Sequence, residues 1–567
     1  MRRLDPSSPK PAASPMAASA WAALAVAVAA HVWLGLSFIR SAAPTFDEPV
    51  HLASGYSYWV TGRYRLNITD HPPLAEMWAA VPLLAMRPRL SQSHPDWIRM
   101  RRYDYSDHFL YRNSVPAERL MNAARAFSFL TLSALLLAAL GLWAHRLGGA
   151  AAAVGSCAAA AFCPVLVSNL ALVTTDGASA VLFFLVFWLL SREARPRRLW
   201  AAAGACAGLA LASKFNMILI GPVAAGMLCL DHLLRRGKGR PRFPWGGAAL
   251  AAGCAALALA AVYRVTQLPL FWEGLSDTLG RLGEGRASYL MGEYSGTGFW
   301  LYFPVALAVK TPLPTLALAA GTGLWWLKGR RRERLWVVLP AFAYFLAAQT
   351  AKVQIGVRHL LPMMPFVALL AGCGAGRLWE LGARWRAPVV LLGVWLAGSV
   401  LRVHPHQLAY FNEAAGGPER GHRWLVDSNL DWGQDLKTLA RAVRELGDPP
   451  IYLAFFGSGD PAAYGLRYVP VLYNWSNPLS RAGDPVDPAA AGRVLLAVSA
   501  TALEAAYIPE RDIFGWLKER EPLEVLGHSI FLYDLTDDRD GRGRLAEVLR
   551  KSDHPRYPGL SKSLLLH

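Results

Sequence analysis

Two adjacent carboxylates follow the first long apolar run of the chain. Asp47 and Glu48 stand in the segment FDEPVHLASGYSYW, a short distance beyond that run. Ionisable groups near a membrane interface are costly unless they have a partner or a function, so both are candidates for acid–base chemistry. The alternative is a solvated loop with helix caps and turns, because Asp is a common cap.

A second acidic position precedes a later apolar run. Asp176 follows two threonines in the segment TTDGASA and opens a predicted helix. Helix capping by Thr or Asp explains these residue types by itself. If Asp176 has a chemical function, it is a second carboxylate that faces the same outer space as Asp47.

Several basic residues stand beside or inside apolar runs, where an anionic partner is expected. Lys214 lies in GLALASKFN without a flanking polar stretch, and a lysine that extends its head group to the interface is the alternative. Lys310 lies within an apolar run, and Lys352, Arg358 and His359 border another one. We expect these residues to form a ring of cations opposite the outer carboxylates.

This combination of acids and cations limits the chemistry. Nucleotides are not supplied outside the membrane, so an activated group must arrive on a lipid. A lipid-phosphate leaving group needs cations that take up its developing charge, whereas an acceptor hydroxyl needs a carboxylate as general base. Glycosyl transfer from a lipid phosphate has both requirements, and its oxocarbenium-like transition state tolerates nearby carboxylates.

Membrane-spanning helices must position these residues. Apolar residues make up 54% of the 567-residue chain and charged residues 17%, against about 25% charged in soluble proteins. The apolar residues form long continuous runs, which excludes a cytosolic enzyme and a β-barrel. Eleven runs are predicted to span the membrane, at residues 17–38, 120–144, 150–168, 172–191, 199–212, 215–231, 245–263, 300–327, 335–350, 359–376 and 388–403.

Loops rich in basic residues alternate with loops that are poor in them. Clusters of Arg and Lys, including Lys238, Arg240, Arg242, Arg330 and Arg331, fall at residues 192–198, 231–242 and 328–334. Because basic loops remain cytoplasmic, we expect a cytoplasmic N-terminus, a C-terminus outside, and a multi-pass protein of the inner (plasma) membrane. The same placement explains the net charge of +18 without nucleic acid as a partner.

The predicted architecture is an all-α polytopic membrane protein with a C-terminal extracytoplasmic α/β domain. The expected parts are a cytoplasmic tail at 1–16, a transmembrane module at 17–403 with outer loops at 40–118 and 264–299, and the outer domain at 404–567. Strands of that domain are expected at Ile451–Phe456, Arg493–Val498 and Ser529–Tyr533, and a helix with one apolar face at Leu436–Leu446.

The outer domain carries one segment that resembles a calcium loop. Asp427, Asn429, Asp431 and Asp435 follow its spacing, but Trp432 stands where the loop needs glycine, and its final glutamate is also missing. A helix cap is therefore favoured at Asp431 or Asp435. No other metal spacing is found in the histidines or in the six cysteines, so no cofactor is assigned and a divalent cation is left open.

The order of these segments resembles the GT-C superfamily of membrane glycosyltransferases, in the branch of protein O-mannosyltransferases and aminoarabinose transferases (glycosyltransferase family 39). The resemblance covers residues 17–403 and is carried by FDEPVHLASGYSYW, HPPLAEMW, TTDGASA, GLALASKFN and RHLLPMMPFVALLAG. The tail stretch YFNEAAGGPERGHRWLVDSNLDWGQDLK resembles a bacterial subgroup distinct from the named enzymes, so the sugar and the acceptor stay open.

The resemblance implies inverting transfer from a polyprenyl-phosphate sugar to a hydroxyl of a protein, lipid or glycan at the outer face of the membrane. It implies that Asp47 is the base with Glu48 beside it, that Asp176 is a second acid, and that Lys214 and Arg358 hold the donor phosphate. From their positions we add Lys310 and Lys352 to the phosphate site, and His71, His359 and Glu293 as substrate contacts.

Two other functions remain open at this point. A transporter or lipid flippase usually places ionisable residues at mid-membrane between repeats, whereas here only Lys310 lies deep within an apolar run. A non-catalytic assembly protein would use its tail to bind a partner and would not need the Asp47 carboxylate.

Overall fold

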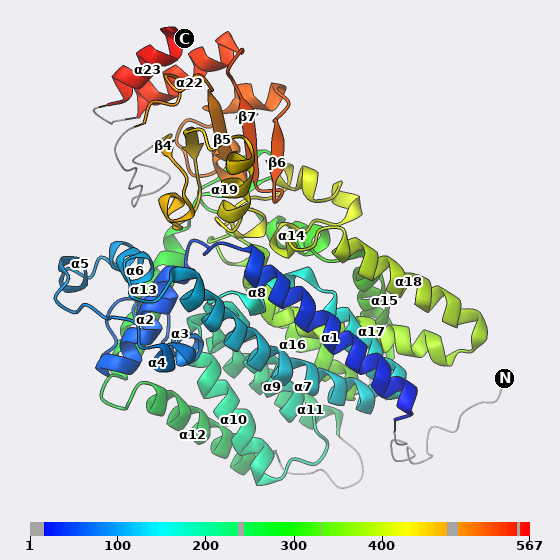
Figure 1. Ribbon diagram of the computed structural model, residues 1–567. Coiled ribbons are helices and arrows are strands. Elements are labelled where there is room, and N and C mark those ends of the chain that lie inside the picture. The colour runs from blue at the N-terminus through cyan, green and yellow to red at the C-terminus, as the bar shows by residue number, and fades with distance from the viewer. Residues whose placement is uncertain (1–15, 236–242, 330–331, 473–485, 553–555, 567) are drawn as a thin grey trace.

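The computed structural model describes residues 16–235, 243–329, 332–472, 486–552 and 556–566. The expected cytoplasmic tail up to residue 15, and the basic residues Lys238, Arg240, Arg242, Arg330 and Arg331, lie outside them. A helical bundle forms most of the molecule, and a region that contains a β-sheet lies at one end of it (Figure 1).

The long helices of the bundle follow the apolar runs of the sequence, and further helices lie in the segments 40–118 and 264–299 that were expected as loops. Their bounds are α1 Ala18–Ser41, α2 Glu48–Thr61, α3 Leu74–Ala79, α4 Val81–Met86, α5 Pro95–Ile98, α6 Arg102–Tyr111, α7 Ala117–Ala161, α8 Pro164–Ala171, α9 Thr175–Leu190, α10 Arg197–Leu211, α11 Ile220–Leu234, α12 Trp245–Val262, α13 Pro269–Glu284, α14 Tyr302–Lys310, α15 Leu313–Gly329, α16 Arg332–Gln349, α17 Met364–Glu380 and α18 Ala383–Leu401. Short 3₁₀ turns at Phe215–Leu219 and Val357–Met363 precede α11 and α17.

The protein is a multi-pass membrane protein, but the predicted count of eleven spans is not confirmed. Among the described residues, six helices are long and apolar enough to cross a membrane, or eight if two bent pairs each count as one span. The pairs are α8 with α9, bent by 118°, and α14 with α15, bent by 119°. The run at 300–327 is thus broken near Lys310, and α10 has only 15 residues.

Small side chains bring α7 and α17 into close contact. A Cβ atom at Gly372 of α17 would lie 2.0 Å from the backbone nitrogen of Ser156 on α7, and one at Gly376 would lie 2.5 Å from that of Ala152. Membrane helices associate closely where such small residues face each other. This contact fixes α17, whose preceding turn carries Arg358.

The C-terminal region contains a five-stranded mixed sheet in the order β4-β3-β5-β7-β6. The two parallel pairings are β3 with β4 and with β5, and the two antiparallel ones are β7 with β5 and with β6. The bounds are β3 Ile451–Ala454, β4 Tyr468–Pro470, β5 Leu495–Ser499, β6 Glu524–Leu526 and β7 Ile530–Asp534, and the helices are α19 Leu436–Glu445, α21 Ala500–Leu503, α22 Arg539–Lys551 and α23 Tyr557–Leu566. Three strands and α19 therefore lie where the sequence predicted them.

Alternation along the strands places one helix on each face of this sheet. Leu453 and Leu495 pack with Leu439 of α19, whereas Tyr452 and Leu496 belong to the apolar cluster that contains α22. Successive strand side chains point to opposite faces, so this pattern needs apolar residues throughout the central strands.

Candidate functional site

The carboxylate of Asp47 is positioned by a chain segment held between the bundle and the C-terminal region. After α1 ends at Ser41, the backbone N–H of Ala43 donates to the carbonyl of Gln434 (2.8 Å), and that of Phe46 donates to the carbonyl of Trp432 (2.9 Å). Asp47 then occupies the position before the first turn of α2. The C-terminal region, called the tail below, thus fixes the backbone that precedes Asp47.

Two carboxylates and two cations form a connected cluster. Nη1 of Arg358 lies 3.4 Å from Oδ2 of Asp47 and 3.5 Å from Oδ2 of Asp176. Nζ of Lys214 donates to Oδ1 of Asp176 at 2.5 Å. The Asp176 side chain is 2% exposed and the Asp47 side chain 26%, so Asp47 is the carboxylate that an external molecule can reach.

Arg358 also keeps an unused hydrogen-bond donor. Its guanidinium lies 4.1 Å from the centre of the Trp432 ring, which holds its plane against the tail. Its Nε–H is buried and has no hydrogen-bond partner among the described residues. A buried unsatisfied donor is costly, and an anion that entered the cluster would satisfy it.

Glu48 is completely buried and differs from its neighbour in every contact. Its oxygens accept from Nε (2.8 Å) and Nη2 (2.5 Å) of Arg125, and from the backbone N–H groups of Thr45 and Val173 (both 2.8 Å). Burial alone would raise the pKa of Glu48, but the Arg125 charge and these donors outweigh it and lower the pKa. With both oxygens engaged, Glu48 ties the segment before Asp47 to the loop before Asp176.

A buried group of two histidines and a carboxylate adjoins the cluster. Nδ1 of His51 lies 2.8 Å from Oε1 of Glu76, which also accepts from the Asn67 amide at 2.6 Å. The His51 and His71 rings are 5.0 Å apart. Burial opposes protonation of His51, but Glu76 outweighs burial and raises its pKa, whereas burial and the nearby His51 charge lower the pKa of His71. His71 was expected from the sequence. His51 was missed, although it stands one helical turn after Asp47.

Three other predicted residues lie apart from this cluster. Lys310 is buried and donates to the carbonyls of Leu408 (2.9 Å) and Asn429, so it ties the tail to the end of α14. Lys352 is exposed and donates to the carbonyl of Gly283 at 2.8 Å. Glu293 is exposed on β2 (Glu293–Ser295), which pairs with β1 (Ser288–Leu290).

His359, in contrast, lies near the cations of the cluster. Its ring stacks on Phe303 with a centroid distance of 6.2 Å, and the charges of Lys214 and Arg358 act on it. The structure therefore brings together Asp47, Asp176, Lys214 and Arg358, with His71 and His359 beside them.

The C-terminal region and the 264–299 segment add groups that the sequence did not single out. The guanidinium of Arg286 lies 5.1 Å from the centre of the Tyr507 ring, and the Tyr507 hydroxyl is bonded to Asp427. The charges of both Asp427 and Asp47 act on Arg286. Burial raises the pKa of Asp427 despite the nearby Arg286 charge. Arg286, Asp427 and Tyr507 are far apart in the chain, so no sequence spacing could indicate that they lie together.

The calcium-like spacing in the tail does not converge on one point. Asp431 accepts from the backbone N–H of Thr501 (2.8 Å), and Asp435 is bonded to His406 and Ser529 (2.8 and 2.7 Å). Burial raises the pKa of Asp431 to about 7. Across the described ranges, no group of three or more His, Cys, Asp or Glu side chains is arranged to hold a metal ion.

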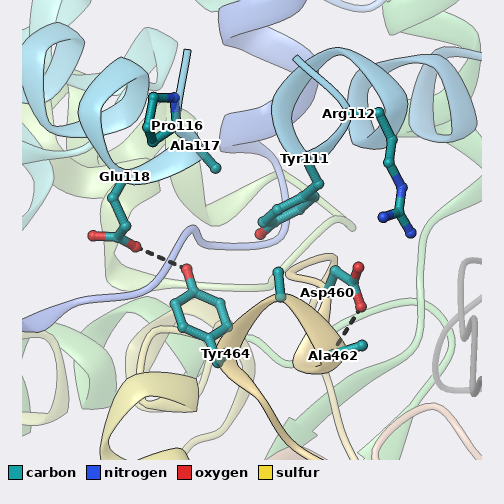
Figure 2. A pocket seen from close by; sticks show the side chains of 9 residues that line it. Tyr111, Arg112, Pro116, Ala117, Glu118, Asp460, Ala462 and Tyr464 are labelled. Atoms are coloured by element: carbon teal, nitrogen blue, oxygen red, sulfur yellow. Dashed lines mark hydrogen bonds between the residues drawn. The ribbon is translucent and has the colours of Figure 1, made fainter. Parts of the chain in front are cut away.

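A cavity of about 390 Å³ opens where the end of the 40–118 segment meets the C-terminal region (Figure 2). Tyr111 and Arg112 line one side of it, and Asp460 lies opposite. The Tyr464 hydroxyl closes the floor by donating to Glu118 at 2.9 Å. Ser458, two residues before Asp460, connects this region to the Asp47 segment: its hydroxyl donates to the carbonyl of Phe46 at 2.7 Å.

Comparisons with known proteins give a family match and a fold. The family described as dolichyl-phosphate-mannose-protein mannosyltransferase matches residues 118–261, and no curated protein sequence matches the chain. The crystal structure of ArnT from Cupriavidus metallidurans bound to undecaprenyl phosphate is similar with a TM-score of 0.51 and 13% identity, covering 91% of this chain and 98% of that one. The Archaeoglobus fulgidus oligosaccharyltransferase in its apo form has a TM-score of 0.45 and 12% identity, covering 86% and 70%.

The likeness to ArnT shows the fold, and the family match falls on α7 to α12, the helices that carry Asp176 and lead to Lys214. Both agree with the resemblance to GT-C membrane glycosyltransferases expected from the sequence.

The Glu48 contacts predict a large difference between two neighbouring carboxylates. Glu48→Ala leaves Arg125 buried without a counter-charge, which costs about 3–5 kcal/mol of folding free energy. Asp47→Ala removes only a partly exposed contact and should cost far less. Thermal unfolding of both purified variants in detergent measures this, and equal losses would contradict the positioning role of Glu48.

Proposed function

We propose that this protein is a glycosyltransferase, which transfers a sugar from a polyprenyl-phosphate donor to an acceptor hydroxyl at the outer face of the membrane, with inversion. One observation carries the proposal: the accessible Asp47 carboxylate lies 3.4 Å from Arg358, whose guanidinium also contacts the Asp176–Lys214 pair. A base for the acceptor and cations for the leaving group thus meet at one place. The undecaprenyl phosphate in the similar ArnT crystal structure supports a carrier of this class.

In the proposed reaction, Asp47 takes the proton of the acceptor hydroxyl while the hydroxyl oxygen bonds to the anomeric carbon. The bond from that carbon to the phosphate oxygen breaks, and its electron pair stays on the phosphate. Arg358 and Lys214 stabilise the developing negative charge, and the unused Nε–H of Arg358 supplies a further donor. Asp176 holds the two cations in place.

The proposed topology places residues 404–567 and the outer loops 40–118 and 264–299 on the outer side, with the N-terminus cytoplasmic in an inner membrane. The backbone hydrogen bonds of Ala43 and Phe46 to the C-terminal region support a location of that region and of Asp47 on the same side of the membrane. The proposed division remains a cytoplasmic tail, a transmembrane module to residue 403 and a C-terminal domain.

The break between α14 and α15 does not support the alternative function of a transporter. Transporters use broken helices to line a substrate site. Here the Asn412 amide donates to the carbonyls of Ala308 (2.6 Å) and Thr311 (2.9 Å) at the break between α14 and α15. Lys310, beside the break, donates hydrogen bonds to two backbone carbonyls of the C-terminal region. The break is therefore filled by the tail.

Asp47→Asn should abolish transfer while leaving donor binding intact, because it removes the base and keeps the shape of the side chain. Loss of a general base costs roughly 10²–10⁴-fold in rate. Cells whose chromosomal gene is deleted are given either the unmodified gene or the Asp47→Asn gene. Mass spectrometry of their envelope glycans, lipids and proteins then reports transfer. Asp277→Asn, at an exposed acid on α13, is the matched control. Restoration of the product by Asp47→Asn would refute the assignment.

Lys214→Ala and Arg358→Ala should each weaken binding of undecaprenyl phosphate about tenfold or more, since charge-assisted hydrogen bonds contribute about 1.5–3 kcal/mol. Titration of the purified variants with this lipid measures the change. Lys352→Ala removes an exposed lysine outside the cluster and should bind like the unmodified protein. Unchanged affinity in both cluster variants would exclude them as the phosphate site.

The topology can be tested with single cysteines in a background without the six native ones. A cysteine at Glu547, exposed on α22, should react with an impermeant thiol reagent in intact spheroplasts. A cysteine at Arg198, exposed at the start of α10, should react only after lysis. The opposite pattern would place Asp47 on the cytoplasmic side, where nucleotide sugars are available, and would remove the main argument for a lipid-linked donor.

A further inference from the structure

One buried carboxylate is shared by three guanidinium groups at the end of the bundle away from the β-sheet (Figure 1). Asp231, near the end of α11, is 4% exposed. Nη2 of Arg195 lies 2.9 Å from Oδ2 of Asp231, and Nη2 of Arg332 lies 3.0 Å from the same oxygen. Nε of Arg235 lies 3.4 Å away. A single negative charge therefore holds three positive ones.

Further arginines add to this excess of positive charge. Arg146 donates to the Ser191 hydroxyl at 2.9 Å, and Arg192 lies over the Trp188 ring with a distance of 5.2 Å to its centre. The other carboxylates whose charges act on this cluster are Glu193 and Glu333. Five guanidinium groups thus stand against three carboxylates. We call these five arginines, Arg146, Arg192, Arg195, Arg235 and Arg332, the arginine cluster.

Two buried donors of the arginine cluster have no acceptor. The Nε–H of Arg146 is buried and has no hydrogen-bond partner among the described residues, and the same holds for the Nε–H of Arg235, whose contact with Asp231 lacks hydrogen-bond geometry. Buried donors without acceptors cost free energy that a bound anion would recover. Arg235 lines a cavity of about 210 Å³ together with Arg195, Trp200 and the carboxylates of Asp231 and Glu193.

Apolar side chains stand exposed next to the arginine cluster. Leu233 and Leu234 at the end of α11 are 44% and 45% exposed, and Trp245 at the start of α12 is 73% exposed. Trp200 also lines the cavity and lies under Arg195. A free inorganic anion would leave this apolar surface uncovered, whereas a lipid covers it with its chains. Tryptophan at helix ends is typical of the membrane interface.

We propose that the arginine cluster binds the phosphodiester head group of an anionic phospholipid. Arginine is suited to this ligand, because its planar guanidinium pairs with two phosphate oxygens at once. Basic pockets between membrane helices take acidic lipid head groups for the same reason. The bound phosphate neutralises the excess charge, and its oxygens accept from the unpaired Nε–H groups. This site lies apart from the Asp47 cluster and does not depend on the proposed reaction.

The test uses the purified full chain in detergent and titrates dioleoyl phosphatidylglycerol against dioleoyl phosphatidylcholine, with native mass spectrometry to count bound lipid and thermal unfolding to report stabilisation. We expect phosphatidylglycerol to bind and stabilise and phosphatidylcholine to do neither. The double variant Arg146→Gln/Arg192→Gln should bind phosphatidylglycerol on the order of tenfold more weakly. Arg146→Lys/Arg192→Lys keeps the charge and should retain most of the affinity, which separates binding from folding.

Arg384→Gln/Arg386→Gln is the matched control, because these exposed arginines lie over Trp385 and Trp379 outside the cluster. An equal loss of affinity in this control would overturn the proposal, since any interfacial arginine pair would then serve. So would equal binding of phosphatidylcholine, or unchanged affinity in the Arg146→Gln/Arg192→Gln protein. Inorganic phosphate alone could also stabilise the unmodified chain but not the Arg146→Gln/Arg192→Gln variant. That result would assign the site to a free anion and not to a lipid.

Discussion

The site depends on the buried ion pair between Glu48 and Arg125. Arg125 stands on α7, and besides Glu48 it donates to the carbonyls of Ala42 and Ala43 at 2.8 Å each. Glu48 in turn accepts from the backbone N–H of Thr45, which precedes Asp47, and from that of Val173, which precedes Asp176. A fully buried pair is stable only when its remaining hydrogen-bonding positions are also satisfied, and here the backbone satisfies them. The positions of Asp47 and Asp176 relative to each other therefore follow from one electrostatic contact that touches neither side chain.

The tail is built into the same site. It bonds to the backbone before Asp47, and it also fixes the segment before Arg358, where the Ser428 hydroxyl donates to the carbonyl of Ile355 (2.7 Å) and the Val357 N–H donates to the Asn429 side chain (2.8 Å). Trp432 then supports the Arg358 guanidinium. The proposed base and the arginine proposed to bind phosphate thus share one support. A tail that only recognised a partner would not need these contacts.

The sequence predicted those parts of the molecule that depend on local pattern. Apolar runs located most helices, and alternation located three strands of the sheet. Residue type located Asp47, Asp176, Lys214 and Arg358, because an isolated charge beside an apolar run is conspicuous. The sequence also predicted that these four residues share one side of the membrane, but their contacts with one another come from the fold and could not be read from spacing.

The differences between the predictions and the structure have physical reasons as well. The eleven expected spans assumed continuous helices, but α8–α9 and α14–α15 bend sharply, so length and apolarity do not define one span there. Lys310 looked like a phosphate ligand, since nothing in its neighbourhood along the chain offers an acceptor. Its acceptors are carbonyls about a hundred residues further along. Glu48 and Asp47 are adjacent and chemically alike, and only burial separates their roles.

The charges of the Asp47 cluster connect donor binding with proton transfer in the proposed reaction. Asp47 and Asp176 balance Arg358 and Lys214, so the cluster is neutral before a donor enters. A donor phosphate brings further negative charge and competes with both carboxylates for the same guanidinium. Arg358 lies about equally far from the two carboxylates, 3.4 Å from Asp47 and 3.5 Å from Asp176, but the Asp47 side chain is 26% exposed and that of Asp176 only 2%, so water can replace Arg358 more easily at Asp47. Arg358 therefore turns more readily from Asp47 than from Asp176. The donor phosphate and Asp47 thus share one guanidinium, which connects donor binding with the carboxylate that the proposed reaction uses as its base.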